Sequence, residues 1–310
     1  MTTGHELTST RIVLSLVDGV FMNMTRLSIM RFMGFLRPLR VWAPVSLLVL
    51  LCACGGSTGF QPKVTAVKAQ VLQYGRTATI YIGGADLRLS VVADAGSVCT
   101  NPAYASFSTT ELLVLNCTVT ATGDMPLTLK SASGEVLYQT TLHVPKPQVA
   151  VTTSKGVITL ELDPTAAPVT VNNFLKYVQT GYYKNTLFHR VIAGFVVQGG
   201  GYTSGMVKKE GQNAPIALET NKGLSNLRGT VAMARTGEPN SATSEFFINL
   251  VDNTRLDYQS EASPGYAVFG SVVKGLDVVD AIAAEVTGVV NGYSDVPVAD
   301  VTITQVLQIK

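Results

Sequence analysis

Short segments rich in Val, Leu, Ile, Thr and Tyr, separated by Gly, Pro, Asn, Asp and Ser, make up most of this 310-residue chain. Such segments are typical of β-strands joined by turns. Apolar residues recur at helical spacing in only two places, at Val171, Phe174, Leu175 and Val178 and again within 274–285. The sequence therefore predicts a mainly β protein with two helices, and its length allows two domains.

The composition favours folded domains, since 46% of the residues are hydrophobic and only 14% are charged. The formal net charge of +2 arises entirely from the first 53 residues, which hold five basic and two acidic side chains. The rest of the chain carries 18 basic against 19 acidic residues. This balance gives no electrostatic indication of nucleic-acid binding.

Residues 1–53 are predicted to be a leader. Arg31, Arg37 and Arg40 precede a short apolar run over 41–51, which is too short to span a bilayer and resembles a secretory signal peptide within 30–53. Residues 1–29 are superfluous to such a signal and are expected not to be translated, because Met24 or Met30 makes a more usual start.

Leu51-Cys52-Ala53-Cys54 resembles a bacterial lipobox, whose last cysteine is lipidated and becomes the mature N-terminus. Cys54 is therefore the expected lipidation site, and 54–62 the expected tether; an ordinary cleaved signal without lipid is the alternative. Gly55 stands where an aspartate would retain a lipoprotein at the inner membrane. We expect a lipoprotein of the bacterial cell envelope that faces the periplasm from the outer membrane.

Residues 63–146 are predicted to form a small immunoglobulin-like β-sandwich. Cys99 and Cys117 are the only cysteines after Cys54, and they most simply pair in an oxidising compartment, with two free buried thiols as the alternative. The segment shows no catalytic pattern, so we expect a spacer or a binding module whose partner the sequence does not identify. The strands are expected at 77–82, 87–92, 111–121, 125–131 and 135–144.

Pro145 and Pro147 mark the boundary to a second domain, 147–310, which begins with a predicted hairpin that turns at 154–156. Pro168 suits the first turn of the first helix and Gly181 its C-terminal cap. Many strands with only two helices predict a barrel or sandwich with helical covers.

The stretch FHRVIAGFVVQGG at 188–200 is mostly apolar yet contains a permanent cation, Arg190. Strand alternation predicts Arg190 on the side of Phe188 and Ile192, and His189 on the opposite side as a structural histidine. The run QGGG at 198–201 lacks the Lys-Ser/Thr ending of a phosphate loop, so we interpret it as a tight turn.

Five segments in register resemble the successive signature motifs of the cyclophilins, and the likeness runs from about 148 to 310, closest to the periplasmic bacterial members. The resemblance implies an eight-stranded antiparallel β-barrel capped by two helices, peptidyl-prolyl cis–trans isomerase activity without cofactor or metal, and proline-containing polypeptides of the cell envelope as partners. The segments are FHRVIAGFVVQGG (188–200), GTVAMAR (229–235), SEFFI (244–248), LD (256–257) and GYAVFG (265–270).

The resemblance also implies site residues. Arg190 matches the catalytic arginine, with Phe195, Gln198 and Glu245 as the other catalytic candidates. Glu245 stands where the family usually has glutamine. Arg255 and Tyr266 replace a tryptophan and a histidine that are common in eukaryotic members, and this suggests weak cyclosporin binding. The implied substrate-binding residues are Val196, Ala234, Arg235, Phe247, Leu256 and Tyr266.

The expected chemistry needs no nucleophile. Rotation about an X–Pro bond localises the nitrogen lone pair, so a donor such as Arg190 binds the twisted state better than either planar state. Two alternatives stay open: Arg190 as a structural ion-pair member, and a barrel that grips proline segments with little turnover. Glu245 is expected to lie close to Arg190, to occupy part of its donors, and to lack the amide donor that glutamine would offer the substrate, so Glu245→Gln is expected to raise kcat/KM.

Overall fold

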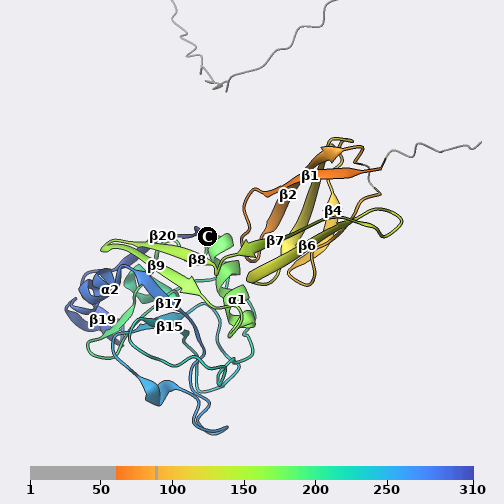
Figure 1. Ribbon diagram of the computed structural model, residues 1–310. Coiled ribbons are helices and arrows are strands. Elements are labelled where there is room, and N and C mark those ends of the chain that lie inside the picture. Colours follow the sequence, from red (N-terminus) through yellow and green to blue (C-terminus); the bar gives the residue numbers. More distant parts are fainter. Residues whose placement is uncertain (1–60, 88–89) are drawn as a thin grey trace, which may run out of the picture. The chain divides into compact units, whose positions relative to one another are not determined.

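The structure is a computed structural model that describes residues 61–87 and 90–310 (Figure 1). The predicted signal peptide and the lipidation site Cys54 lie outside these residues and stay predictions. Within the described ranges, no helix is long and apolar enough to cross a membrane.

The first domain has seven strands in two antiparallel sheets, with the orders β1-β2-β5-β4 and β3-β6-β7. This division of seven strands is that of a constant-type immunoglobulin sandwich, as predicted. The inward-facing residues of both sheets form one apolar core. The strands are β1 (Lys63–Ala69), β2 (Thr77–Ala85), β3 (Val92–Asp94), β4 (Cys99–Tyr104), β5 (Leu112–Val119), β6 (Gly123–Lys130) and β7 (Val136–Val144).

Cys99 and Cys117 form a disulfide between the adjacent strands β4 and β5, with Cα atoms 5.5 Å apart. The bridge therefore lies within one sheet rather than between the two. The prediction of a strand at 87–92 is wrong. Leu87 and Val91 are both buried in the core, but Ser90 lies in a turn, Val91 belongs to no regular element, and the strand begins only at Val92.

The second domain is a single curled antiparallel sheet in the order β10-β20-β8-β9-β17-β15-β16-β12-β11. Its two ends, β10 and β11, are separated only by Phe188 and His189, so one segment supplies both edges and the sheet closes as an eight-stranded barrel. The strands are β8 (Gln148–Thr153), β9 (Gly156–Leu162), β10 (Thr186–Leu187), β11 (Arg190–Ile192), β12 (Val196–Gly199), β15 (Thr230–Met233), β16 (Phe246–Asn249), β17 (Val268–Lys274) and β20 (Thr302–Gln308).

Four short strands lie outside this sheet as two hairpins, β13 (Tyr202–Thr203) with β14 (Val207–Lys208), and β18 (Thr287–Val290) with β19 (Tyr293–Pro297). The second hairpin packs beside β11. It brings Asp295 towards Arg190.

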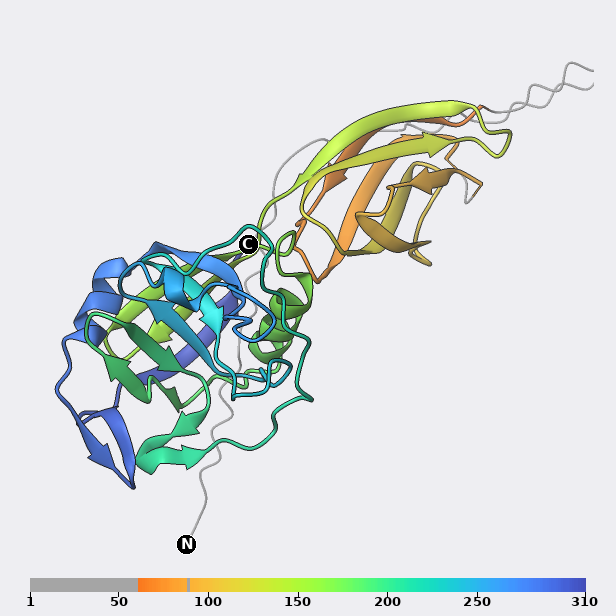
Figure 2. The ribbon, with the colours of Figure 1, turned by 90° about the horizontal axis from the view of Figure 1, so that it is seen from below.

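The two predicted helices are present as α1 (Pro168–Gln179) and α2 (Leu276–Ala283), on opposite sides of the barrel (Figures 1 and 2). Pro168 occupies the first turn of α1, and Gly181 after its end has a φ of 69°. The predicted apolar face of α1 is fully buried in the barrel core. The cyclophilin-type fold expected from the sequence is confirmed.

The barrel domain has two apolar clusters, one inside the barrel and one on its outer surface. Strand β16 separates them by alternation, since Phe246 and Ile248 point into the interior while Phe247 joins the outer cluster with Val196, Ala232 and Val268. The outer cluster forms the floor of the site described next.

Candidate functional site

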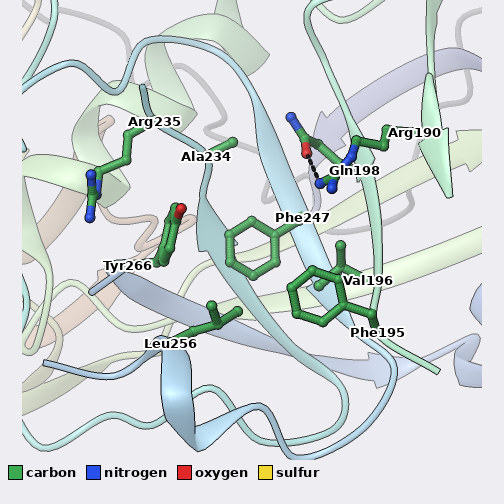
Figure 3. Close-up of a pocket in the computed structure, with 9 residues that line it drawn as sticks. All are labelled: Arg190, Phe195, Val196, Gln198, Ala234, Arg235, Phe247, Leu256 and Tyr266. Atoms are coloured by element: carbon green, nitrogen blue, oxygen red, sulfur yellow. Dashed lines mark hydrogen bonds between the residues drawn. The ribbon is translucent and has the colours of Figure 1, made fainter. Parts of the chain in front are cut away.

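A cavity of about 200 Å³ lies on the outer surface of the barrel. Figure 3 shows its apolar side chains gathered around the Phe247 ring, with Arg190 and Arg235 on opposite sides. All nine residues that line it were predicted from the sequence as site residues, and only Glu245 of the predicted set is missing. The lining residues are Arg190, Phe195, Val196, Gln198, Ala234, Arg235, Phe247, Leu256 and Tyr266.

Strand register explains why residues distant in the sequence meet here. Arg190 on β11 stands opposite Gln198 on β12, Gln198 stands opposite Phe247 on β16, and Phe247 stands opposite Ala232 on β15. Side chains directly opposite one another project from the same face of a sheet. The row therefore places the cation at one end of the apolar cluster.

The cavity is apolar at its centre and polar at its rim. The rings of Phe247 and Tyr266 meet edge to face with centroids 5.6 Å apart, an arrangement that aromatic pairs favour. Leu256 and Phe195 pack against the same cluster and remain partly exposed. The shape and chemistry suit a small apolar ring that enters from solvent.

A buried amide network supports two walls of the cavity, at Phe195 and at Leu256. Asn253 donates to the backbone oxygen of Phe195 (2.9 Å) and to Asn249 (2.9 Å), and Asn249 donates to Asn226 (3.2 Å). Asn226 in turn donates to Asp257, next to Leu256, at 2.8 Å. Because these asparagines are at most 3% exposed, the network holds the walls against the barrel.

Asp257 anchors the loop that carries Leu256. Burial raises the pKa of its carboxyl, but hydrogen bonds from the Ser225 hydroxyl and from the backbone and side chain of Asn226 outweigh burial, so the net pKa is lowered. Position 265, opposite this loop, requires glycine. Its φ is 71°, and a Cβ there would lie 2.6 Å from backbone atoms of Leu256 and Asp257.

Arg190 is not among core residues, and the predicted alternation is wrong at this point. Phe188 lies in the barrel interior, whereas Arg190 faces the outer cavity with 40% of its side chain exposed. The reason is that Phe188 and His189 connect β10 to β11 outside any regular strand, so alternation does not continue across them. Arg190 is held on one side by Gln198 Oε1, at 3.3 Å from its Nη1.

The expected contact between Glu245 and Arg190 is also not formed. Glu245 Oε2 instead accepts hydrogen bonds from Gln198 Nε2 (2.9 Å) and His189 Nε2 (3.2 Å). Hydrogen bonds thus link four side chains one after another, in the order His189, Glu245, Gln198 and Arg190. We call this series the Arg190 hydrogen-bond chain. The carboxylate that lies nearest the guanidinium is Asp295, 3.9 Å from Nε.

The environment of Glu245 favours its ionised form. Burial raises the pKa of this carboxyl. This effect is outweighed by the hydrogen bond and charge of His189, the hydrogen bond from Gln198 and the charge of Lys208, so the net pKa is lowered. His189 is 4% exposed, and its Nδ1 has no partner among the described residues, so we assign the Nε2 proton to the bond with Glu245. Its predicted role as an isolated structural histidine is therefore incomplete.

The run QGGG is needed for close packing as well as for turning. A Cβ on Gly201 would lie 2.5 Å from Cγ of Glu245, and one on Gly200 would lie 2.9 Å from the backbone oxygen of Ser244. Only glycine leaves the room that Glu245 needs to reach His189.

A second cavity of about 290 Å³ adjoins the first and shares Gln198, Ala234 and Arg235 with it. Lys208 and Glu245 are the other charged residues that line it. Arg235 stands between the two cavities, with its guanidinium 4.6 Å from the Tyr266 ring centroid.

The arrangement can bind an apolar ring and place a cationic donor beside it. The nine residues lining the first cavity include no serine, threonine, cysteine or histidine, so the cavity has no nucleophile paired with a base. In the part of the chain that the structure describes, no three acidic, histidine or cysteine side chains gather in a way that could hold a metal ion.

Sequence reasoning missed His189 as the partner of Glu245, Asp295 as the neighbour of Arg190, and the asparagine network. The asparagines had a detectable signal, because Asn249 directly follows the apolar FFI run and Asn253 follows four residues later, yet both are polar. Asp295 had none, since 105 residues separate it from Arg190.

Residues 148–308 match the family model described as cyclophilin type peptidyl-prolyl cis-trans isomerase. Over 162 residues the chain is 51% identical to peptidyl-prolyl cis-trans isomerase A of Dickeya dadantii, covering 52% of this chain and 84% of that relative. It is 50% identical over 156 residues to peptidyl-prolyl cis-trans isomerase B of Escherichia coli, covering 50% and 94%. A crystal structure of a Cryptosporidium parvum cyclophilin type isomerase aligns with 53% of this chain and 98% of its own, at 25% identity and a TM-score of 0.44.

Proposed function

The chain belongs to the cyclophilin type peptidyl-prolyl cis–trans isomerases, and we propose that it performs this isomerisation in the outer-surface cavity, with Arg190 as the catalytic residue. The enzyme accelerates rotation about X–Pro bonds. Its proposed substrates are proline-containing segments of other polypeptides, with the proline ring against Phe247 and the imide nitrogen towards Arg190.

The proposed mechanism is differential binding of the twisted imide. The barrier to rotation is about 18–20 kcal/mol because nitrogen shares its lone pair with the carbonyl group. In the twisted state that pair is localised on nitrogen and can accept a hydrogen bond. An arginine donor placed there lowers the barrier without a covalent step.

The observation that carries this proposal is the state of Arg190. Its guanidinium is held on one side by the hydrogen bond from Nη1 to Gln198, while 40% of the side chain is exposed to solvent at the edge of an apolar cavity. Guanidinium has five N–H donors in a rigid fork, so donors remain for a substrate after Gln198 has taken one. A guanidinium whose only role was an ion pair would have a carboxylate closer than the 3.9 Å to Asp295.

We also propose that the protein acts in the bacterial cell envelope, anchored by lipid at Cys54 and facing the periplasm. The apolar run followed by Leu51-Cys52-Ala53-Cys54 supports export, and a disulfide between Cys99 and Cys117 suits an oxidising compartment. The glycine-rich tether and the sandwich of residues 63–144 would then hold the isomerase domain away from the membrane, so that its clients are exported proteins.

The experiment that tests the site is Arg190→Ala with a short Ala-Pro peptide as substrate. We expect kcat/KM to fall by about 10²–10³, the scale for losing one transition-state donor. Arg190→Lys should recover little, because one ammonium on a flexible stem does not reproduce the fork. Arg76→Ala, which removes an exposed arginine from the first domain, is the matched control and should behave as the unmodified protein.

Peptide binding measured beside turnover separates the enzyme from a module that only grips proline segments. Tight binding with rates equal to buffer in the unmodified protein would support the gripping module. A folded Arg190→Ala protein with unchanged kcat/KM would remove Arg190 from the mechanism.

A further inference from the structure

Positive charge is concentrated around the proposed proline site. Arg190, Arg235 and Lys208 line the two adjoining cavities, and Glu245 is the only acidic residue that lines them. From residue 54 onward the chain has 18 basic against 19 acidic residues, so this local excess does not follow from overall basicity. The excess belongs to the site.

The acidic groups that contact the site are engaged elsewhere, and Glu238, next to the Gly237 oxygen that accepts from Arg235, forms no ion pair among the described residues. Glu245 accepts bonds from His189 and Gln198, and Asp257 accepts bonds from Ser225 and Asn226. Asp295 approaches Arg190 no closer than 3.9 Å. None of these carboxylates pairs with Arg235 or Arg255. The ion pairs that occur among the described residues involve other cations.

Arg235 is a fixed cation with a free edge. Its Nε donates to the backbone oxygen of Gly265 at 2.9 Å, and its Nη1 donates to that of Thr236 at 2.9 Å, while the guanidinium stacks on Tyr266. These bonds use backbone oxygens, so they hold the guanidinium without neutralising it. No acceptor for Nη2 occurs among the described residues. The two N–H groups of Nη2 therefore have a fixed orientation and can donate to an acceptor on a bound substrate.

Arg255 is a second unpaired cation, on a different wall. Its guanidinium lies 4.8 Å from the ring centroid of Phe195, and the residue is exposed. Arg255 stacks on Phe195 and Arg235 stacks on Tyr266, and both rings border the first cavity. Successive residues of a polypeptide are about 3.8 Å apart, so the two residues on either side of a proline held between these rings extend roughly 7–8 Å from it, towards the walls that carry the two cations.

We infer that this site selects X–Pro segments with Asp or Glu within two residues of the proline. A carboxylate matches the paired donors of a guanidinium edge, and it would replace the anion that Arg235 and Arg255 lack within the protein. The inference rests on the proposed proline site and adds to it the chemical class of the favoured substrate.

The test is a peptide series with the protein unchanged. Capped peptides without terminal charges carry Glu, Gln or Lys at each of the two positions before and after a single proline, and kcat/KM is measured by NMR exchange without a coupling protease. At the most responsive position we expect Glu to exceed Gln by about three- to fivefold at low salt, the scale of partly exposed ion pairs. Lys should fall below Gln, and both differences should shrink at high salt.

Variants are compared by the ratio of Glu-peptide to Gln-peptide kcat/KM, which does not depend on basal activity. Arg235→Gln and Arg255→Gln should each bring this ratio towards one. Lys176→Gln, which removes an exposed cation from α1, should keep it. Equal values for Glu, Gln and Lys peptides that are all isomerised would overturn the selectivity and leave the site intact. Failure to isomerise any of them would overturn the site itself.

Discussion

Replacing Glu245 by glutamine tests whether the Arg190 hydrogen-bond chain orients Arg190, the proposed catalytic residue. The two side chains have the same shape, and both hydrogen bonds end on a single oxygen, Oε2. An amide oxygen in that position can still accept from His189 and Gln198. The variant therefore removes the negative charge while keeping the geometry.

The magnitude follows from the difference between charged and neutral hydrogen bonds. Bonds to charged groups contribute about 1.5–3 kcal/mol and neutral ones about 0.5–1.5, so each bond should lose about 1 kcal/mol. Only the loss at Gln198 can reach Arg190, and the link between them is long at 3.3 Å. We expect kcat/KM to fall about two- to fivefold at neutral pH, since 1.4 kcal/mol corresponds to a factor of ten.

This expectation has the opposite sign to the one drawn from the sequence. The sequence argument assumed that Glu245 occupies donors of Arg190, so that glutamine would release them. In the structure Glu245 contacts Gln198 and His189 instead. Its charge strengthens the hydrogen bond from Gln198, the side chain that in turn orients Arg190.

The pH profile gives a second readout. Because the folded-state pKa of Glu245 is lowered, its contribution to stability is present above the ordinary value of 4.5 and is lost as the pH falls through the lowered value. The unmodified protein should lose activity and stability in that acidic range through this group, whereas Glu245→Gln should lack this step. Protease-free NMR exchange on an Ala-Pro peptide between about pH 3.5 and 8 measures it. Glu238→Gln, at an exposed glutamate, makes the same charge change as a control. A kcat/KM of Glu245→Gln equal to or above that of the unmodified protein at pH 7 would refute the reasoning.

Further predictions concern the proposed lipid anchor and the disulfide of the first domain. Mass spectrometry of membrane-extracted protein should find a lipid-modified N-terminus at Cys54, and an unmodified N-terminus further downstream would count against the anchor. Thiol labelling of unfolded, unreduced Cys54→Ser protein should find neither Cys99 nor Cys117 free, since they form a disulfide across 18 residues. Reduction of that bridge should lower the unfolding free energy of the first domain by about 3 kcal/mol, and stoichiometric labelling without reduction would contradict the pairing.

Regular strands were predictable because alternation and turn residues act over a few neighbouring positions. Strands β5, β6 and β7 lie within two residues of their predicted bounds, and the apolar face of α1 is buried as its spacing indicated. The strands β1 and β4 were not predicted. Both lie at the edges of the four-stranded sheet and bury few side chains, so their alternation is weak. Edge position alone is not decisive, since β7 is also an edge strand and was predicted.

The nine residues of the cavity were found through motif resemblance, and their contacts were not. The side of Arg190 was mispredicted because the chain leaves strand geometry at Phe188 and His189. The partner of Glu245 depends on the length of each side chain and on the room left by Gly201, and neither enters a pattern of apolar residues. Local periodicity thus identifies the elements, whereas the hydrogen-bond chain depends on three-dimensional register.

Strand β16 shows how one segment can serve the fold and the site separately. Phe246 points inward, where its ring meets those of Phe174 and Tyr183 at 5.5 and 5.6 Å, while Phe247 points outward to Tyr266. Phe246→Ala would leave an enclosed void and should cost about 3–5 kcal/mol of unfolding free energy. Phe247→Ala enlarges a cavity already open to solvent and should cost less, about 1.5–3 kcal/mol, while removing the surface proposed to hold the proline ring. Denaturant unfolding and peptide isomerisation, measured on both variants, should therefore rank them in opposite orders: Phe246→Ala as the less stable, and Phe247→Ala as the less active under conditions where both are folded. Equal loss of stability in the two variants would show that the outer cluster is part of the barrel core, and that substrate binding and folding are not separated by the alternation of this strand.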